Sequence, residues 1–176
     1  KNYGEYALDG YFHITVDLEE SYHLDKFVAY TASAYASAGV TGPKSVTVLV
    51  SEDGKAWVHA GTVNPTDTDE TSMLEIVIEP KTVLYGRYVQ FRYVPSNAFV
   101  MVAEVQAFET SVEEHEHVAG EWIRAQEPTL TEKGKNIKTC TVCGVTVETE
   151  DIPELTEEPV ASGCSLGARD AMLSYF

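Results

Sequence analysis

The segment RYVQFRYV, residues 87–94, constrains the fold of this 176-residue chain more than any other stretch. Its apolar residues Val89, Phe91 and Tyr93 alternate with Tyr88, Gln90 and Arg92. Successive side chains of an extended chain point to opposite faces, so this alternation places the two sets on different faces. That period of two is typical of a strand with one face in a hydrophobic core.

Other parts of the first 109 residues carry the same kind of signal. Runs rich in β-branched and aromatic residues are separated by glycine, proline, asparagine and aspartate, and no convincing amphipathic helix interrupts them. Asp53-Gly54, within SEDGKAW, predicts a hairpin. The predicted strands are 13–18, 26–30, 45–50, 73–79, 87–94 and 100–108. Short strands with turns between them favour an all-β sandwich or barrel.

The composition changes after this region, and we expect four parts. Residues 1–109 form the β-sandwich, and residues 110–121 form an acidic linker. Residues 122–155 form a small β-hairpin module around a Cys-x-x-Cys sequence, and residues 156–176 form a poorly ordered tail. A hairpin of this size is marginal alone, so the module needs a metal ion or a neighbour to pack against.

Overall charge and apolar content argue against several function classes. The formal net charge is −16, from 28 acidic and 12 basic residues, and such a surface repels nucleic acid and anionic lipid. No apolar run approaches the ~18 residues needed to cross a bilayer. The chain begins at Lys1 without an initiator methionine, so we expect a fragment of a longer protein. Its three cysteines are too few for a disulfide framework.

Five motifs in order give the first region a resemblance to a known family. They are ITVDL, GVTGPKSV, SEDGKAW, GRYV and the VMVAEVQAF segment that contains Glu104. Together they resemble the discoidin family, the coagulation factor V/VIII type C domains, which includes bacterial carbohydrate-binding modules of family 32. The resemblance covers residues 11–109 and implies a discoidin-like, eight-stranded jelly-roll β-sandwich. Only EYALDGYF precedes the first motif, so we expect an N-terminally incomplete sandwich.

The resemblance also implies a ligand, usually a sugar in bacterial members, held by loops at one end. Mapped by motif, the candidate glycan-binding residues are Tyr35, Phe99, Asn97, Tyr30 and His59. Tyr35 is the strongest of these, because its small neighbours supply no core. Tyr30 ends an apolar strand and Phe99 is of a type that prefers interiors, so a core role stays open for both.

Glu104 is the one charged residue in an otherwise apolar terminal strand. The resemblance implies a structural calcium ion there, bound with an N-terminal loop, to which Asp9 could contribute. A calcium ion takes six to eight oxygen ligands, and the sequence identifies few of them. The alternative is a glutamate on the solvent face of the strand.

Residues 115–155 resemble a short Cys-x-x-Cys repeat found in surface proteins of Gram-positive gut anaerobes. The tryptophan, Pro-Thr, Thr-Glu-x-Gly, Cys-x-x-Cys-Gly and Ile-Pro-x-Leu elements are all present. Two cysteines of that pattern are replaced, the first by His115 and the second by Leu130.

The Cys-x-x-Cys sequence itself leaves three interpretations open. The best set of zinc ligands is Cys140 and Cys143 with His115 and His117, because a tight turn brings two thiolates onto one metal ion. A redox dithiol usually places its first thiol at a helix N-terminus, whereas VCGVTV continues into a strand. The third interpretation is a reduced or disulfide-bonded hairpin in a spacer. The redox state of Cys140, Cys143 and Cys164 stays open.

These observations favour a non-catalytic carbohydrate-binding module of a larger secreted or cell-surface protein. The parent would be a glycosidase or an adhesin of a Gram-positive bacterium, with this region covalently attached and no membrane insertion. No catalytic set emerges, because Glu52 and Asp53 occupy a turn and Ser51 with His59 is no better than a chance pair. The alternative is a structural spacer or protein-contact domain that binds no sugar.

Overall fold

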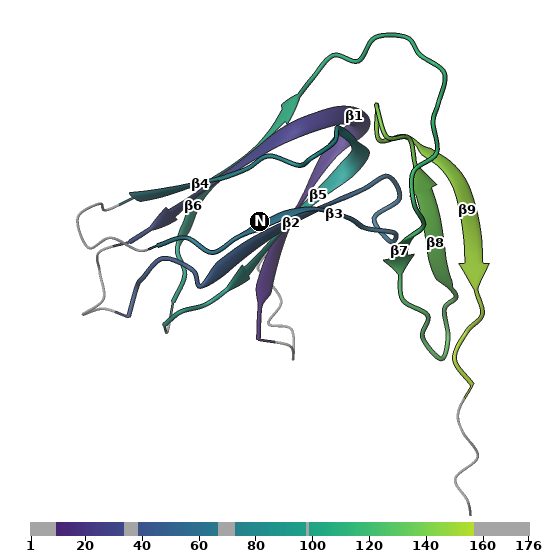
Figure 1. Ribbon diagram of the computed structural model, residues 1–176. Coiled ribbons are helices and arrows are strands. Elements are labelled where there is room, and N and C mark those ends of the chain that lie inside the picture. Colours follow the sequence, from purple (N-terminus) through teal and green to yellow (C-terminus); the bar gives the residue numbers. More distant parts are fainter. Residues whose placement is uncertain (1–9, 34–38, 67–72, 98, 157–176) are drawn as a thin grey trace, which may run out of the picture.

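The computed structural model describes residues 10–33, 39–66, 73–97 and 99–156, and every regular element in these ranges is a β-strand. The all-β class predicted from the sequence is therefore confirmed. None of the described residues forms a helix long and apolar enough to cross a membrane. The strands are β1 (Phe12–Ala32), β2 (Ser45–Ser51), β3 (Val58–Val63), β4 (Met73–Ile78), β5 (Leu84–Val94), β6 (Val102–Glu109), β7 (Ile123–Gln126), β8 (Gly134–Thr139) and β9 (Thr146–Ile152). The first six form one sheet and the last three form another (Figure 1).

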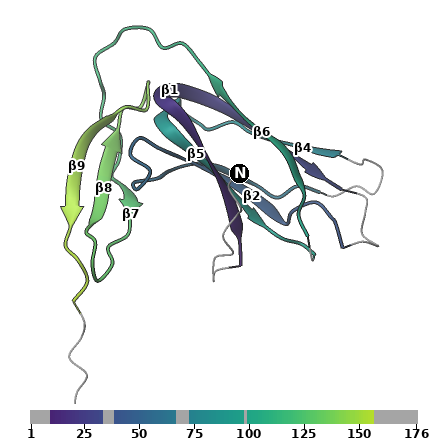
Figure 2. The ribbon, with the colours of Figure 1, turned by 180° about the vertical axis from the view of Figure 1, so that it is seen from behind.

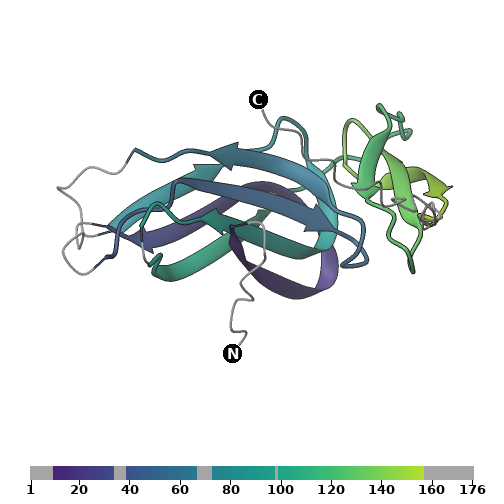
Figure 3. The same ribbon diagram turned by 90° about the horizontal axis from the view of Figure 1, so that it is seen from below.

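The 21-residue strand β1 organises the larger sheet. Its first half pairs with β5, with Phe12 opposite Tyr93, and its second half lies between β4 and β6. The strand order is β3-β2-β5-β1-β4, with β6 on the other flank of β1. Because β1 belongs to both halves, the sheet curls back on itself into two layers, as Figure 3 shows from below.

The prediction of separate strands at 13–18 and 26–30 was wrong, since both belong to β1. The pairing of β1 with β5 is irregular between Asp17 and Tyr22, which marks a bulge. At this bulge Glu19 has a φ of 71°, and its N–H donates to Asp17 Oδ1 at 2.8 Å. The polar run between the two predicted strands therefore bends one strand. The resemblance implied eight strands, whereas the described part of the sandwich has six.

The core lies between the two layers, and β5 supplies its centre. Val89, Phe91 and Tyr93 are each 1% exposed or less, which confirms the predicted core face, although Gln90 of the other face is also buried, at 7% exposed. Across the core, the Phe27 ring of β1 meets the Phe91 ring edge-on at 6.5 Å. Full burial of such side chains contributes roughly 1.5–3 kcal/mol each.

The predicted Asp-Gly hairpin is also confirmed, joining β2 to β3 as antiparallel neighbours. Asp53 Oδ1 accepts hydrogen bonds from the N–H groups of Lys55 and Ala56 at 2.9 and 2.8 Å. Gly54 has a φ of 74°, a conformation that glycine adopts without steric cost. The tip of this hairpin points toward the smaller sheet (Figure 1).

The smaller sheet has the order β7-β8-β9 and contains the predicted hairpin, β8 with β9. The sequence reasoning missed β7, a four-residue strand whose sequence, IRAQ, has no clear alternation. The buried cluster of this sheet comprises Ala125, Ile137 and Ala56, and Ala56 belongs to the β2–β3 hairpin. The small sheet therefore completes its core with the sandwich, beside which it lies in Figures 1 and 2.

Candidate ligand-binding end and candidate metal centre

One end of the sandwich is formed where β1 ends at Ala32 and β5 continues into residues 95–97 and Phe99. We call this the loop end and include Met73, Met101 and residues 39–42 in it. The Ala32 N–H donates to the Met101 carbonyl at 2.8 Å, and the Phe99 N–H donates to the Gly39 carbonyl at 2.9 Å. These two hydrogen bonds hold the backbone that carries the exposed side chains of the loop end.

Three large apolar side chains are exposed at the loop end. Phe99 and Met101 are each 56% exposed, and Met73, opposite Ala32 in the β1–β4 pairing, is 47% exposed. Phe99 therefore lies outside the core. Sequence reasoning missed the two methionines. Their positions in the sequence could have indicated this exposure, because Met73 begins β4 and Met101 directly precedes β6.

Tyr30 is half-buried on β1, between Glu75 of β4 and Glu104 of β6. Its hydroxyl donates to Glu75 Oε1 at 2.8 Å, and this bond raises the pKa of Tyr30 above its usual value. Asn97 is exposed in the loop after β5, next to Ser96. Ser96 Oγ donates to the Gly42 carbonyl at 2.5 Å, which ties the two loops together. Tyr35 lies outside the described residues.

His59 is not at the loop end. It pairs with Leu49 near the far end of β2, whereas Ser45, four residues earlier, pairs with Val94 at the loop end. Four residues of strand span about 13 Å. His59 Nε2 lies 2.9 Å from Thr62 Oγ1, so its ring is engaged with its own strand. The structure thus brings Tyr30, Asn97 and Phe99 to one end and leaves His59 elsewhere.

Glu104 is exposed on β6, where its Oε1 accepts a hydrogen bond from Gln106 Nε2 at 2.7 Å. Within the described ranges, no cluster of three or more histidine, cysteine, aspartate or glutamate side chains includes Glu104. Asp9, the other expected ligand, lies outside those ranges. The calcium site therefore stays a prediction.

Four side chains that could bind a metal ion converge at the opposite end of the sandwich, two from the segment between β6 and β7 and two from the turn between β8 and β9. The ligand atoms of His115, His117, Cys140 and Cys143 all lie within 4.8 Å of one another. His115 Nε2 is 3.4 Å from Cys140 Sγ, and His117 Nδ1 is 3.5 Å from Cys143 Sγ. Both cysteines are free thiols and buried, at 1% and 2% exposed.

Two sets of backbone bonds assemble this cluster. In the turn between β8 and β9, the Cys140 N–H donates to the Val145 carbonyl at 2.8 Å, and the Gly144 N–H donates to the Cys140 carbonyl at 3.0 Å. We call residues 140–145 the cysteine turn. Residues 118–120 pair with residues 139–141 through the Thr141 N–H to Val118 and the Gly120 N–H to Thr139, both at 2.9 Å. This pairing places the preceding segment, which contains His115 and His117, next to the cysteine turn.

The cysteine turn favours a thiolate at Cys140. Burial raises the pKa of this thiol, but hydrogen bonds from the backbone N–H groups of Cys143 and Val142, and from the two histidines, outweigh burial and lower the pKa to about 5. For Cys143, burial raises the pKa. The carbonyl of Glu113 accepts from His115 Nδ1 at 2.7 Å, and this bond, followed by the contact with Cys140, raises the His115 pKa.

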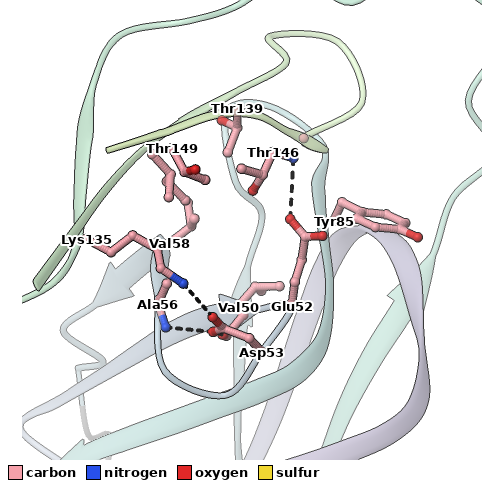
Figure 4. Close-up of a pocket in the computed structure, with 13 residues that line it drawn as sticks. Val50, Glu52, Asp53, Ala56, Val58, Tyr85, Lys135, Thr139, Thr146 and Thr149 are labelled. Carbon is pink, nitrogen blue, oxygen red and sulfur yellow. Dashed lines mark hydrogen bonds and ion pairs between the residues drawn. The ribbon is translucent and has the colours of Figure 1, made fainter. Parts of the chain in front are cut away.

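A cavity of about 250 Å³ lies between the β2–β3 hairpin and the smaller sheet (Figure 4). Lys135 Nζ lies 2.9 Å from Asp53 Oδ2, and the Thr146 N–H donates to Glu52 Oε1 at 3.3 Å. Both carboxylates thus hold the smaller sheet against the hairpin. Glycosidase chemistry needs two carboxyl groups that project into one cleft toward a substrate, and these two have a structural task instead.

A scan of protein-family models and a search of curated proteins each gave no match. Among solved structures, the chain is similar to the CpGH89CBM32-6 protein of Clostridium perfringens, with 16% identity and a TM-score of 0.44 over 59% of this chain and 73% of that one. It is also similar to the C-terminal domain of a chitobiase from Bacteroides fragilis, with 21% identity and a TM-score of 0.41 over 58% of this chain and 66% of that one.

A third similar structure is CBM32-3 from a family 31 glycoside hydrolase of Clostridium perfringens, at 14% identity and a TM-score of 0.42, over 57% of this chain and 67% of that one. Against a family 89 glycoside hydrolase of the same organism, the match spans only 13% of the enzyme. With TM-scores below 0.5, these likenesses assign neither a ligand nor an activity to the chain.

Proposed function

We propose that the sandwich is a non-catalytic carbohydrate-binding module and that the loop end is its ligand face. The observation that carries this proposal is Phe99, an aromatic side chain 56% exposed on a backbone held by a hydrogen bond to Gly39. The ordered discoidin-like motifs of the sequence and the curled two-layer sheet support the same function. The module would belong to a larger extracellular or cell-surface bacterial protein, a glycosidase or an adhesin.

The chemistry of the loop end suits a sugar. Sugars present an apolar C–H face, against which an aromatic ring packs, and hydroxyl groups that need polar partners. Phe99 supplies the ring, with Met101 and Met73 extending the apolar surface beside it. Asn97 and the Tyr30–Glu75 pair supply polar groups. Hydrogen bonds from Phe99 to Gly39 and from Ser96 to Gly42 hold this part of the backbone before a ligand binds, which lowers the conformational entropy lost on binding.

The charge of the protein narrows the ligand class. At a formal net charge of −16, the protein repels polyanions, and Glu75 and Glu104 flank Tyr30. We therefore expect neutral glycans to bind better than sulfated or uronic-acid-rich ones.

Affinity electrophoresis of the full chain through gels that contain single polysaccharides tests the proposal. We expect retardation by at least one neutral polysaccharide and loss of most of that retardation in Phe99→Ala. Phe108→Ala is the matched control, because Phe108 is 41% exposed on β6 but pairs with Lys26, six residues of β1 from Ala32. No retardation by any polysaccharide, or equal loss in both variants, would overturn the proposal in favour of a spacer.

A further inference from the structure

We propose that His115, His117, Cys140 and Cys143 bind one zinc ion, and that this ion fixes the cysteine turn as the joint that docks the smaller sheet onto the sandwich. The inference is independent of sugar binding. It rests on two facts about residues 140–145, namely that they carry both thiols and that they touch the sandwich.

The four ligand atoms lie within 4.8 Å of one another, and two of the distances between them match those of a tetrahedral zinc site. Zinc bonds of about 2.3 Å to sulfur and 2.0–2.1 Å to nitrogen, at tetrahedral angles, place sulfur and nitrogen ligands roughly 3.6 Å apart. The two sulfur–nitrogen distances, 3.4 and 3.5 Å, are close to that separation. Four protein ligands complete the coordination of zinc, which is the arrangement of a structural site and not of a catalytic one.

The surroundings of the four ligands match what a metal site needs. The Nδ1–H group of His115 donates a hydrogen bond to the Glu113 carbonyl at 2.7 Å. The other ring nitrogen, Nε2, faces Cys140 and is the atom that would bind the metal ion. In most metal-binding histidines, the ring nitrogen that does not bind the metal ion donates such a hydrogen bond and thereby orients the ring. An open depression of about 330 Å³, lined by Glu113, Glu114 and both histidines, gives an ion an entry path from solvent.

The cysteine turn is also the point of contact with the sandwich. The Cys143 carbonyl accepts a hydrogen bond from His23 Nδ1 of β1 at 3.0 Å. Gly144 has a φ of 79°, and a Cβ there would come within 2.5 Å of the Val83 carbonyl oxygen. The backbone of the turn therefore lies directly on the start of β5, and a change in the turn changes the docking surface.

The smaller sheet depends on this joint because its own core is small. Besides the two cysteines, its buried apolar residues are Ala125 and Ile137, and the third member of their cluster, Ala56, comes from the sandwich. The Trp57 N–H donates to the Ala125 carbonyl at 2.7 Å across the same interface. When a small module lacks core, free energy of metal binding becomes free energy of folding.

Metal analysis and hydrogen exchange on the full chain, purified under reducing conditions, test both parts of the inference. We expect one Zn²⁺ per chain, and Co²⁺ should give the visible spectrum of tetrahedral cobalt with thiolate ligands. Adding Zn²⁺ to the chelator-treated chain should slow exchange of the Trp57 amide at least tenfold. Failure to bind either metal would overturn the site, and a Cys140–Cys143 disulfide that persists under these conditions would do the same. Zinc binding that leaves Trp57 exchange unchanged would overturn the docking role.

Variants distinguish the loss of a proposed zinc ligand from the loss of any cysteine thiol. Cys143→Ser should weaken Zn²⁺ binding by more than about 100-fold, since even loss of an outer-shell partner costs 10–100-fold. His115→Ala, at a half-buried position of the connecting segment, should do the same without removing a buried side chain. Cys164→Ser is the matched thiol control and should bind Zn²⁺ as the unmodified chain does. Full Zn²⁺ affinity in both Cys143→Ser and His115→Ala would contradict the assigned ligands.

Discussion

The two ends of the sandwich differ in how their side chains are used. At the loop end, Phe99 and Met101 are more than half exposed while hydrogen bonds hold the backbone beneath them. At the other end, Cys140 and Cys143 are buried, and the backbone of their turn contacts His23 and Leu84 of the sandwich. The first arrangement leaves side chains available to a ligand, whereas in the second the backbone of the turn holds the smaller sheet against the sandwich.

The distance between the ends makes them separable in experiments. His23 contacts the cysteine turn and Ala32 contacts Met101, and both residues belong to β1. Nine residues of strand separate them, a span of about 30 Å. Substitutions that far apart, with no shared partner, usually have independent effects. Each prediction below therefore sets a change at one place against a matched change elsewhere.

The largest effect is expected for Gly144→Ala. Gly144 and Gly10 share a positive φ, 79° and 80°, but a Cβ at Gly144 would meet the Val83 carbonyl whereas a Cβ at Gly10 has no atom within 4 Å. Gly10→Ala should lower the free energy of unfolding by about 1–2 kcal/mol, the cost of a left-handed non-glycine residue. Gly144→Ala should cost about 3 kcal/mol or more, because displacement of the docked turn is added. Urea unfolding followed by tryptophan fluorescence measures both, and equal losses would contradict direct docking.

A smaller effect is expected for Lys135→Ala. Lys135 pairs with Asp53 across the interface at 2.9 Å, whereas Lys133 pairs with Asp151 within the smaller sheet at 3.3 Å. Both pairs are partly exposed, so each contributes at most about 1 kcal/mol. Lys135→Ala should speed exchange of the Trp57 amide, and Lys133→Ala should leave it unchanged. If both variants speed exchange equally, the ion pair at Asp53 has no special part in docking.

The same pair predicts a weak pH dependence. Burial raises the pKa of Asp53, but hydrogen bonds from Ala56, Lys135 and Lys55 outweigh it and lower the pKa from 3.8 to about 2. A carboxyl with a lowered folded-state pKa stabilises the fold above its unfolded value, and that contribution is lost as pH falls from about 4 to about 2. Asp53→Asn keeps an acceptor oxygen for the turn and removes the charge. The stability difference between Asp53→Asn and the unmodified chain should shrink over this range, and a constant difference would contradict the charge effect.

The smallest effect is expected for His59→Ala. His59 pairs with Leu49, about 13 Å of strand from the residue that pairs with Val94 at the loop end. Its removal should leave retardation by a bound polysaccharide within twofold of the unmodified chain. A loss as large as that of Phe99→Ala would move the ligand face from the loop end to the outer side of β3.

The sequence predicted the features that depend on local pattern. The core face of β5 and the Asp53-Gly54 hairpin were confirmed because side-chain period and turn chemistry depend on neighbouring residues. The polar run between the two halves of β1 was misread as a break, since a bulge and a loop have similar composition. Strand β7 was missed because its stability comes from packing on Ile137 and Ala56, which lie far away in sequence.

The candidate sites were predictable to different extents. The four candidate zinc ligands were chosen from residue type and spacing, and the structure brings their ligand atoms together. The contact of Cys143 with His23, 120 residues earlier, had no sequence signal. At the loop end, Phe99 could be proposed by motif, but its exposure and the neighbouring methionines depend on how the end of β1 lies beside the starts of β4 and β6.

The division of tasks between the two ends is tested most directly by a glycan array probed with three forms of the full chain: unmodified, Phe99→Ala and Cys143→Ser. Phe99 lies at the loop end of the sandwich, and Cys143 lies in the cysteine turn, which contacts the opposite end of the sandwich. We predict that the unmodified chain binds a set of neutral glycans, that Phe99→Ala loses them, and that Cys143→Ser keeps them although it loses zinc. Binding that survives Phe99→Ala and disappears in Cys143→Ser, or an array with no bound glycan, would contradict the account.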